Sequence, residues 1–397
     1  MARADLGVYV HIPFCATRCD YCAFATWTDR THLIDDYLDA CVTDVMRRRD
    51  DGDLADASTV YFGGGTPSLV PAGDLMRVLD AIPRARDAEV TVECNPDSID
   101  LAKLRTYRAA GVTRISIGVQ STQPHVLAAL GRTHDRANVA RAVDAIRDAE
   151  FLTFNLDVIA GTAGESDADF EATLDDVLAF DPPHVSVYGL MVEPGTPLER
   201  RIAAGEIDPP DADVQADRYL RADTRLGARG LDWYEVSNWA RPGHECRHNR
   251  GYWAGAECVA IGAAAHGHDA ATGTRTWNSP LPERYVERVR TGESPVAGRE
   301  TPDVATRDRE RLGLELRTRD GARIGATPTI RDLDTLGLLT YTDGVAVLTP
   351  RGRLLATEVT LRILGDGAET RIGTRYDGVP VPAPPAASRE RLHQAEP

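Results

Sequence analysis

Short apolar runs alternate with amphipathic stretches along the first two thirds of the chain, and this alternation constrains the fold more than any other feature. The runs are rich in Val, Ile, Tyr and Phe, which favours buried parallel strands. The stretches between them have helical periodicity, and repeated strand–helix units predict an α/β fold with a parallel sheet. The predicted strands are Leu6–Ile12, Thr59–Phe62, Glu89–Glu93, Arg114–Gly118, Thr153–Ile159 and His184–Leu190, and the predicted helices include Asp35–Arg49, Leu101–Ala110, Ala137–Ala149 and Asp169–Ala179.

Glycine and polar residues cluster directly after these predicted strands. Gly63-Gly64-Gly65-Thr66-Pro67 follows the second strand, and Cys94-Asn95-Pro96 follows the third. Each residue alone could be an ordinary turn residue, but in α/β barrels the C-terminal ends of the strands converge on the active site. We therefore expect a partial (β/α)6 TIM-type barrel in which these residues face one cavity.

The pattern changes after about residue 280. Two predicted helices precede two short apolar runs that flank Asp343-Gly344, a dipeptide typical of a β-hairpin turn. This arrangement predicts a small α+β winged-helix-like domain over 280–365, after a barrel domain over 1–270. The Pro, Ala, Gly and charged residues of 366–397 predict a disordered tail. The elements predicted in the C-terminal domain are helices at Arg307–Leu316, Thr329–Leu336 and Leu354–Leu364 and strands at Leu338–Thr342 and Val345–Leu348.

Charge and hydropathy argue against several classes of protein. The 397 residues carry a net charge of −16, whereas a nucleic-acid binder needs a basic face. No apolar run reaches the length of about 18 residues that a membrane-spanning helix needs. The N-terminus has neither the basic start nor the long apolar stretch of a signal peptide. We therefore expect a cytoplasmic protein with, at most, peripheral association with a membrane.

Three of the seven cysteines, Cys15, Cys19 and Cys22, lie within eight residues, and the odd total does not indicate a disulfide framework. Thiolates this close can converge on one metal centre. A [4Fe–4S] cluster usually has four cysteine ligands, so three would leave one iron open to a small molecule. The alternative is a zinc knuckle, which needs a fourth Cys or His. His11 is near in sequence, but it belongs to the first predicted strand.

The C-x3-C-x2-C spacing, with the aromatic Tyr21 before the last cysteine, resembles the signature of the radical S-adenosylmethionine (SAM) family. The resemblance implies a [4Fe–4S] cluster on Cys15, Cys19 and Cys22, whose open iron binds the amino and carboxylate groups of SAM, with Tyr21 among the cofactor-binding residues. It also implies that one electron from the cluster cleaves SAM to a 5′-deoxyadenosyl radical inside a full or partial (β/α) barrel. The protein then orients and shields the cofactors.

Further motifs narrow the resemblance to one branch of this family, which contains coproporphyrinogen III dehydrogenases and haem chaperones. By this resemblance, Tyr9, Gly64 and Glu93 would hold one SAM. The residues alone leave open an internal salt bridge between Arg132 and Asp157. The motifs, within a match over 5–365, are Tyr9-Val-His-Ile-Pro-Phe14, Gly63–Pro67, Glu93-x-Asn95-Pro96, Gly118-Val-Gln120-Ser121, Gly131-Arg132-x-His134 and Asn155-x-Asp157, and the residues that correspond to a second SAM site are Gly65, Thr66, Gln120, Arg132, Asp157 and Met191.

Two features favour the haem chaperones over the dehydrogenases. The dehydrogenases carry a further cysteine two positions after the last cluster ligand, where this chain has Phe24. The chaperones carry an HNxxYW pattern, which is here His248-Asn249-Arg-Gly-Tyr252-Trp253. The resemblance therefore implies a protein that binds haem and passes it to acceptor proteins, with a reductant protein that serves the cluster. The alternative is a dehydrogenase that oxidatively decarboxylates coproporphyrinogen III in porphyrin biosynthesis.

His248 is the residue we select as the axial ligand of the haem iron, because a His can ligate that iron and aromatic neighbours can pack on a porphyrin. His248 could instead satisfy backbone groups in a buried loop, and the residues do not decide between the two. A third class, a structural zinc protein or nucleic-acid binder that uses the winged-helix-like domain, conflicts with the net charge of −16. The competing haem ligands in the same region are His244, His266, His268, Cys246 and Cys258.

Overall fold

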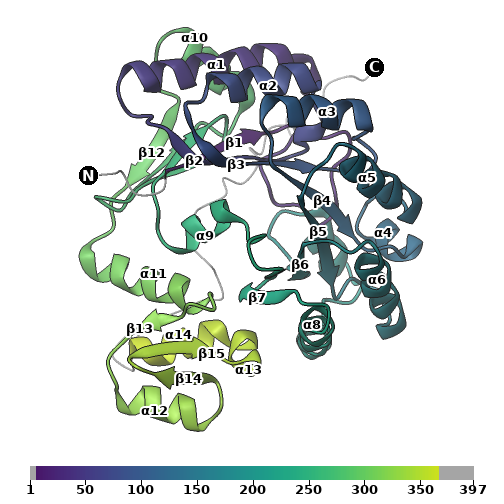
Figure 1. The fold of residues 1–397 in the computed structure, drawn as a ribbon, viewed down its shortest axis with the longest axis vertical. Helices are drawn as coiled ribbons and strands as arrows, with labels where there is room; N and C mark the ends of the chain where they lie inside the picture. Colours follow the sequence, from purple (N-terminus) through teal and green to yellow (C-terminus); the bar gives the residue numbers. More distant parts are fainter. Residues whose placement is uncertain (1–5, 366–397) are drawn as a thin grey trace, which may run out of the picture.

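The computed structural model describes residues 6–365, so the tail predicted at 366–397 lies outside the described residues. Twelve strands form one mostly parallel sheet, in the order β12-β11-β10-β9-β1-β2-β3-β4-β5-β6-β8-β7 (Figure 1). β1 to β6 are successive parallel neighbours and confirm the six predicted strands. β6 pairs with β8 and not with β1, so the sheet forms a partial barrel that stays open. These strands are β1 (Gly7–Ile12), β2 (Ala57–Gly64), β3 (Arg84–Cys94), β4 (Arg114–Gln120), β5 (Thr153–Ala160) and β6 (His184–Gly189).

Six further strands extend both edges of this sheet, and the sequence patterns did not predict them. Each has only three to five residues, which is too short for a clear periodic signal. β9 is parallel to β1, and the strands beyond it are antiparallel. Their bounds are β7 (Asp232–Glu235), β8 (Asn238–Ala240), β9 (Cys258–Ile261), β10 (His266–Asp269), β11 (Thr274–Asn278) and β12 (Val296–Glu300).

Helices cover the outer face of the parallel strands (Figure 1). In β1, Val8, Val10 and Ile12 are fully buried on this helical side. Tyr9 and His11 point to the inner side, because side chains alternate along a strand. Among residues 6–365, no helix is both long and apolar enough to cross a membrane. The helices of this part are α1 (Ile34–Asp50), α2 (Ala72–Ala81), α3 (Leu101–Ala110), α4 (Pro124–Ala129), α5 (Arg136–Asp148), α6 (Asp167–Ala179), α7 (Pro197–Ala203), α8 (Ala212–Gly227), α9 (Arg247–Trp253) and α10 (Pro282–Arg290).

The C-terminal part has a sheet and an apolar cluster of its own. The cluster includes Leu316, Ile330, Leu348 and Val359. The predicted hairpin is confirmed, with Asp343 and Gly344 at φ values of 52° and 80° between its strands, as a type I′ turn requires. The division of the chain at 280 stays a prediction, since β12 still pairs within the larger sheet. The elements are α11 (Val304–Leu316), β13 (Ala322–Arg323), α12 (Pro328–Thr335), β14 (Leu339–Thr342), β15 (Val345–Leu348), α13 (Pro350–Leu354) and α14 (Ala356–Leu364).

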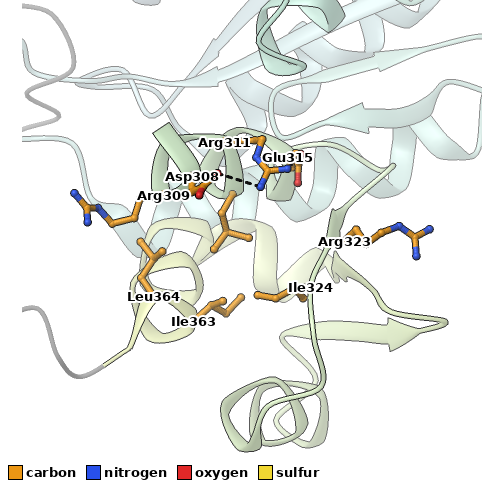
Figure 2. Close-up of a pocket in the computed structure, with 9 residues that line it drawn as sticks. Asp308, Arg309, Arg311, Glu315, Arg323, Ile324, Ile363 and Leu364 are labelled. Carbon is orange, nitrogen blue, oxygen red and sulfur yellow. Dashed lines mark hydrogen bonds and ion pairs between the residues drawn. The ribbon is translucent and has the colours of Figure 1, made fainter. Parts of the chain in front are cut away.

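A surface hollow of about 300 Å³ lies in this C-terminal part, where α11 and the end of α14 meet the segment after β13. Figure 2 shows its apolar side chains, among them Ile324, Ile363 and Leu364, below a charged edge with Arg311 near Asp308. None of the predicted site residues lines this hollow. The functional site therefore has to be sought in the barrel.

Arg353 of α13 joins the C-terminal part to the barrel. Its guanidinium donates two hydrogen bonds to Asp223 of α8, at 2.9 and 2.7 Å. The same group lies over the ring of Trp233, 4.4 Å from its centroid. A bidentate ion pair that also packs on an aromatic ring fixes both distance and orientation.

We expect Arg353→Ala to lower the free energy of unfolding by about 2–3 kcal/mol, because it leaves a partly buried carboxylate without its main partner. Arg353→Lys should not restore the loss, since an ammonium cannot reproduce the planar fork. Denaturant unfolding of both variants measures this. Arg362→Ala is the control, because its ion pair with Glu358 is exposed. An equal loss in the control would contradict the prediction.

Candidate functional site

The three cysteines of the predicted cluster lie in the loop that leaves β1 at the C-terminal end of the parallel strands. The N–H of Cys15 donates to the carbonyl of Trp27 at 3.0 Å, which ties the loop to a later segment. A turn brings the N–H of Cys22 to the carbonyl of Cys19 at 3.2 Å. None of the three is in a disulfide. The loop therefore presents three sulfur donors from one short segment.

Donors from elsewhere in the barrel reach two of these sulfurs. The Thr66 hydroxyl lies 3.6 Å from Sγ of Cys15, and Nη1 of Arg132 lies 3.6 Å from Sγ of Cys19. Burial raises the pKa of the Cys15 thiol, and the hydrogen bond from Thr66 and the charge of Arg132 oppose that rise. Such donors stabilise a thiolate, which is the form that ligates iron. The donor set therefore fits a [4Fe–4S] cluster.

His11 does not supply the fourth ligand that a zinc knuckle would need. Nε2 of His11 donates to the carbonyl of Ala25 at 2.9 Å, so Nδ1 accepts from the Tyr9 hydroxyl at 3.1 Å. Both ring nitrogens are thus engaged. Within residues 6–365, no three His, Cys, Asp or Glu side chains stand close enough to hold a single metal ion. Thiolates that bind different irons of one cluster stand farther apart than ligands of a single zinc ion do.

The glycine-rich end of β2 packs against the cysteine loop. The N–H of Gly65 donates to the carbonyl of Ile12 at 2.8 Å, and a Cβ on Gly65 would lie 2.7 Å from the carbonyl oxygen of Phe14. Gly64 has a φ of 108°, and its Cβ would lie 2.3 Å from the ring of His11. Only glycine permits this conformation and this approach without strain.

Glu93, near the end of β3, connects this glycine segment to the inside of the barrel. Its Oε1 accepts from the hydroxyl of Tyr61 at 2.8 Å, and its Oε2 accepts from the N–H of Gly64 at 3.1 Å. Burial raises the pKa of Glu93 to about 7, although both hydrogen bonds oppose the rise. In its ionised form the group suits an ammonium or a ribose hydroxyl, and its role toward SAM stays a prediction.

Arg132 and Gln120 converge over Gly118 of β4. Nη2 of Arg132 donates to the carbonyl of Gly118 at 2.7 Å and to Oδ1 of Asn95 at 3.0 Å. A Cβ on Gly118 would lie 2.9 Å from Nε2 of Gln120 and 3.3 Å from Nη2 of Arg132. Gln120 ends β4 with a φ of 63°, which bends the chain toward this point. The glycine therefore makes room for both side chains beside the cysteines.

Asp157 faces the inner side from β5, but it does not pair with Arg132. Its Oδ1 accepts from the amide of Asn155 at 2.7 Å, and its Oδ2 accepts from the hydroxyl of Ser116 at 3.4 Å. The interpretation of Arg132 and Asp157 as an internal salt bridge is therefore wrong. The two side chains instead stand at separate points on the inner face.

The remaining residues predicted near SAM lie at different depths. Tyr9 stacks with Tyr61 inside the barrel, with ring centroids 6.3 Å apart. Tyr21 packs on an apolar cluster that contains Leu130, and its pKa is raised by burial and by the nearby Cys19. Met191 follows β6 and is 63 % exposed. The structure thus brings Tyr9 and Tyr21 to the buried site but leaves Met191 at the surface.

His248 lies at the opposite end of the barrel from the cysteines. Its Nδ1 is 2.9 Å from the hydroxyl of Thr59, and its ring stacks on Tyr61 with centroids 5.2 Å apart. A Cβ on Gly7 would lie 3.2 Å from the ring, so the first residue of β1 must be small. The N–H of His248 donates to the carboxylate of Glu89 at 3.0 Å, which holds the start of α9 in place.

The polar inner face of the strands was not among the predictions from the sequence. Polar side chains on this face bond to one another. The two ring nitrogens of His184, for example, form hydrogen bonds with Oδ1 of Asn155 at 2.7 Å and with the hydroxyl of Tyr234 at 2.8 Å. The available signal was strict alternation, in which these polar residues occupy every second position between buried Val, Ile and Leu. The inward-facing polar residues that were overlooked are Glu89, Thr91, Arg114, Ser116, His184 and Ser186.

Comparison with known proteins bears directly on this site. Residues 9–177 match the radical SAM superfamily. The haem chaperone HemW of Mycobacterium tuberculosis is 44 % identical over 382 residues, which cover 92 % of this chain and 96 % of the relative. The chain belongs to the HemW family. HemW of Bacillus subtilis is 31 % identical over 380 residues, which cover 91 % of this chain and 99 % of that protein. The resemblance inferred from the motifs is thereby confirmed.

One solved structure shares the fold of this HemW-family chain across both of its parts. Coproporphyrinogen III oxidase (HemN) from Escherichia coli, a radical SAM enzyme, superposes with a TM-score of 0.77 and covers 90 % of each chain at 22 % identity. The predicted fold class is confirmed by this likeness. Membership of the radical SAM family implies a [4Fe–4S] cluster and SAM, and the cysteine loop fits the first of these.

We expect Gly64→Ala to lower the free energy of unfolding by about 2–4 kcal/mol, because a Cβ at positive φ would press on the ring of His11. The iron bound after reconstitution should fall with it, since the cysteine loop packs on this segment. Denaturant unfolding and iron analysis measure the two effects. Gly73→Ala is the control, because its Cβ would meet nothing within 4 Å. If both variants behave alike, the close packing is not what requires glycine.

We expect Glu93→Gln to make the apoprotein less sensitive to rising pH. A carboxyl whose pKa is raised from 4.5 to about 7 by folding stabilises the fold below pH 4.5 and loses that contribution as the pH rises through 7. Between pH 5 and pH 8, the free energy of unfolding of the wild type should therefore fall by about 2–3 kcal/mol relative to that of the variant. Unfolding of the apoproteins across this range tests it, with the exposed Glu287→Gln as control.

Proposed function

We propose that this chain is a haem chaperone, which binds haem and a SAM-coordinated [4Fe–4S] cluster and transfers the haem to acceptor proteins. Support comes from relatives named haem chaperone HemW that align with the chain over nearly its whole length. It also comes from the HNxxYW segment, which forms α9 and enters the barrel at the end opposite the cysteines.

The observation that carries the proposal is the position of the His248 ring. It stacks on Tyr61, and the hydroxyl of Tyr61 donates to Glu93 at 2.8 Å. Glu93 in turn accepts from Gly64, beside the cysteine loop. One aromatic ring thus separates the proposed haem ligand from the carboxylate proposed to contact SAM. This arrangement suits a protein whose two cofactors act together.

His248 has the chemical form that an axial ligand needs. Burial lowers its pKa to about 4, so the imidazole is neutral at physiological pH. Thr59 holds Nδ1 at 2.9 Å, and no described residue forms a hydrogen bond with Nε2. A ligating His commonly has its other nitrogen fixed by a hydrogen bond in this way. We therefore assign haem iron to Nε2 of His248.

The cysteine end supplies the site for the second cofactor pair. Cys15, Cys19 and Cys22 would hold three irons of the cluster, and the bound pair supplies one-electron chemistry. Glu93 would orient SAM by hydrogen bonds, and the glycine segment would let the backbone approach it closely. Arg132 places a positive charge next to Cys19 and so offsets the negative charge of the thiolates.

A second function, coproporphyrinogen III dehydrogenase, has one observation in its favour. The HemN fold extends over 90 % of the chain, including the C-terminal part. Against it stands Phe24, which is 66 % exposed at the position where the dehydrogenases carry a further cysteine. The two functions predict different products, so one paired assay separates them.

We expect His248→Ala to lower the affinity for haem by roughly 10- to 100-fold, because it removes the axial bond to iron. Anaerobic haem titration of the reconstituted protein, followed by absorbance, measures this. His244→Ala is a matched control, since Nδ1 of His244 likewise lies 2.9 Å from a threonine hydroxyl, that of Thr153. Retained affinity in His248→Ala would contradict the assignment of the ligand.

The same preparation is incubated with coproporphyrinogen III, SAM and a reductant. The chaperone proposal expects tight haem binding and no decarboxylated porphyrinogen. Turnover without tight haem binding would replace it with the dehydrogenase function. Transfer of bound haem to an acceptor apoprotein, followed by the acceptor's absorbance, tests the final step.

A further inference from the structure

Arg114 occupies the inner face of the barrel at the level of Tyr61. The parallel register aligns Tyr61 with Thr91 of β3, and Thr91 with Arg114 of β4. Partners in such a register point to the same side of the sheet. Ser116, two residues further along β4, is aligned with Glu93. Arg114 therefore lies one level below Glu93, toward the end of the barrel where His248 enters.

The Arg114 side chain is buried without a direct ion pair. It is 2 % exposed, and among residues 6–365 nothing forms a hydrogen bond or an ion pair with it. The other two buried arginines behave differently. Arg218, at 3 % exposure, pairs with Glu165 at 2.7 Å, and Arg353, at 6 %, pairs with Asp223 at 2.7 Å. Arg114 is thus the exception among the buried arginines described.

The carboxyl groups of Glu89, Glu93 and Asp157 are all close enough to interact electrostatically with Arg114, but none forms a hydrogen bond or an ion pair with it. Glu89 lies close enough to affect Arg114, but its two oxygens are used elsewhere. Oε2 accepts from the N–H of Arg247 at 3.0 Å, and Oε1 accepts from the N–H of His248 at 3.0 Å. Glu89 therefore holds α9 and leaves the guanidinium unpaired.

A buried guanidinium without a direct partner is costly, so its presence indicates an anion that the described residues do not place in contact with it. Tyr9, Tyr61 and Glu93 all point inward, and all three keep some accessible surface. A guanidinium matches a carboxylate in particular, because two parallel N–H groups meet its two oxygens.

We propose that Arg114 is the receptor for a carboxylate of a ligand that enters the barrel, and that this ligand is haem, held through a propionate. This inference rests on the proposed haem binding. The SAM carboxylate has the same chemistry, but Arg114 lies level with Tyr61, on which His248 stacks, whereas the cysteine loop follows the other ends of the strands. His248 would then ligate the iron, and Arg114 would bind a propionate of the same haem molecule.

The experiment compares haem with haem dimethyl ester, which has no free carboxylates, on anaerobically reconstituted wild type and Arg114→Gln. Wild type should bind haem about 10- to 100-fold more tightly than the ester. Arg114→Gln should lose this preference and bind both ligands as the wild type binds the ester. The control Arg105→Gln, an exposed arginine on α3, should keep the wild-type preference.

The outcomes separate this inference from the function on which it rests. Tight haem binding by wild type that Arg114→Gln leaves unchanged overturns the role of Arg114 and keeps the chaperone proposal. Absence of haem binding by wild type overturns both. A SAM titration is the second arm: weakened SAM binding with unchanged haem binding in Arg114→Gln overturns the choice of haem.

Thermal unfolding of the ligand-free proteins provides an independent measurement. Since Arg114 makes no described bond, Arg114→Gln should leave the unfolding midpoint unchanged or raise it by a few degrees. A drop of several degrees would mean that Arg114 is structural and would overturn the proposal. Arg114→Lys keeps the charge without the fork, and it should recover only part of the preference for haem over the ester.

Discussion

The parallel pairing of β1 to β6 is the constraint on which the rest of this molecule depends. Helices bury one face of these strands, so every second residue must be apolar, and the alternate residues are free to be polar. In a register that aligns Tyr61, Thr91 and Arg114, those polar residues fall into levels inside the barrel. The cysteine loop at one end and His248 at the other are both reached from this inner face.

The sheet also explains how residues that are far apart in the sequence connect the two ends of the barrel. Glu93, Tyr61 and His248 come from β3, β2 and α9, yet they form one continuous stack of contacts. No single segment contains this arrangement. It arises because neighbouring parallel strands place their inward side chains side by side, and because Glu89 fixes the start of α9 against β3.

The sequence was sufficient for the elements with strong periodicity and for motifs confined to one segment. The six central strands, the hairpin at Asp343-Gly344 and the resemblance carried by Cys15, Cys19 and Cys22 all belong to this class. The strands β7 to β12 could not be predicted from the sequence, because three to five residues are too few to show a periodic pattern. The location of His248 could not be predicted either, since its contacts with Thr59 and Gly7 join residues that are far apart in the sequence. Arg114 was overlooked because its strand was treated as apolar when it in fact alternates.

The pairing of β1 with β9 has a consequence for how the chain is made. Gly7 pairs with Thr59 on one side and with Cys258 on the other, so β1 leaves the ribosome long before β9, its second neighbour, has been synthesised. Until then one edge of β1 is unpaired, and such an edge invites association with other chains. The N–H of Gly7 finally bonds to the carbonyl of Glu257, a few residues beyond α9. The step that closes this edge therefore also brings His248 into the barrel, so the end of the barrel that contains His248 is assembled late in biosynthesis.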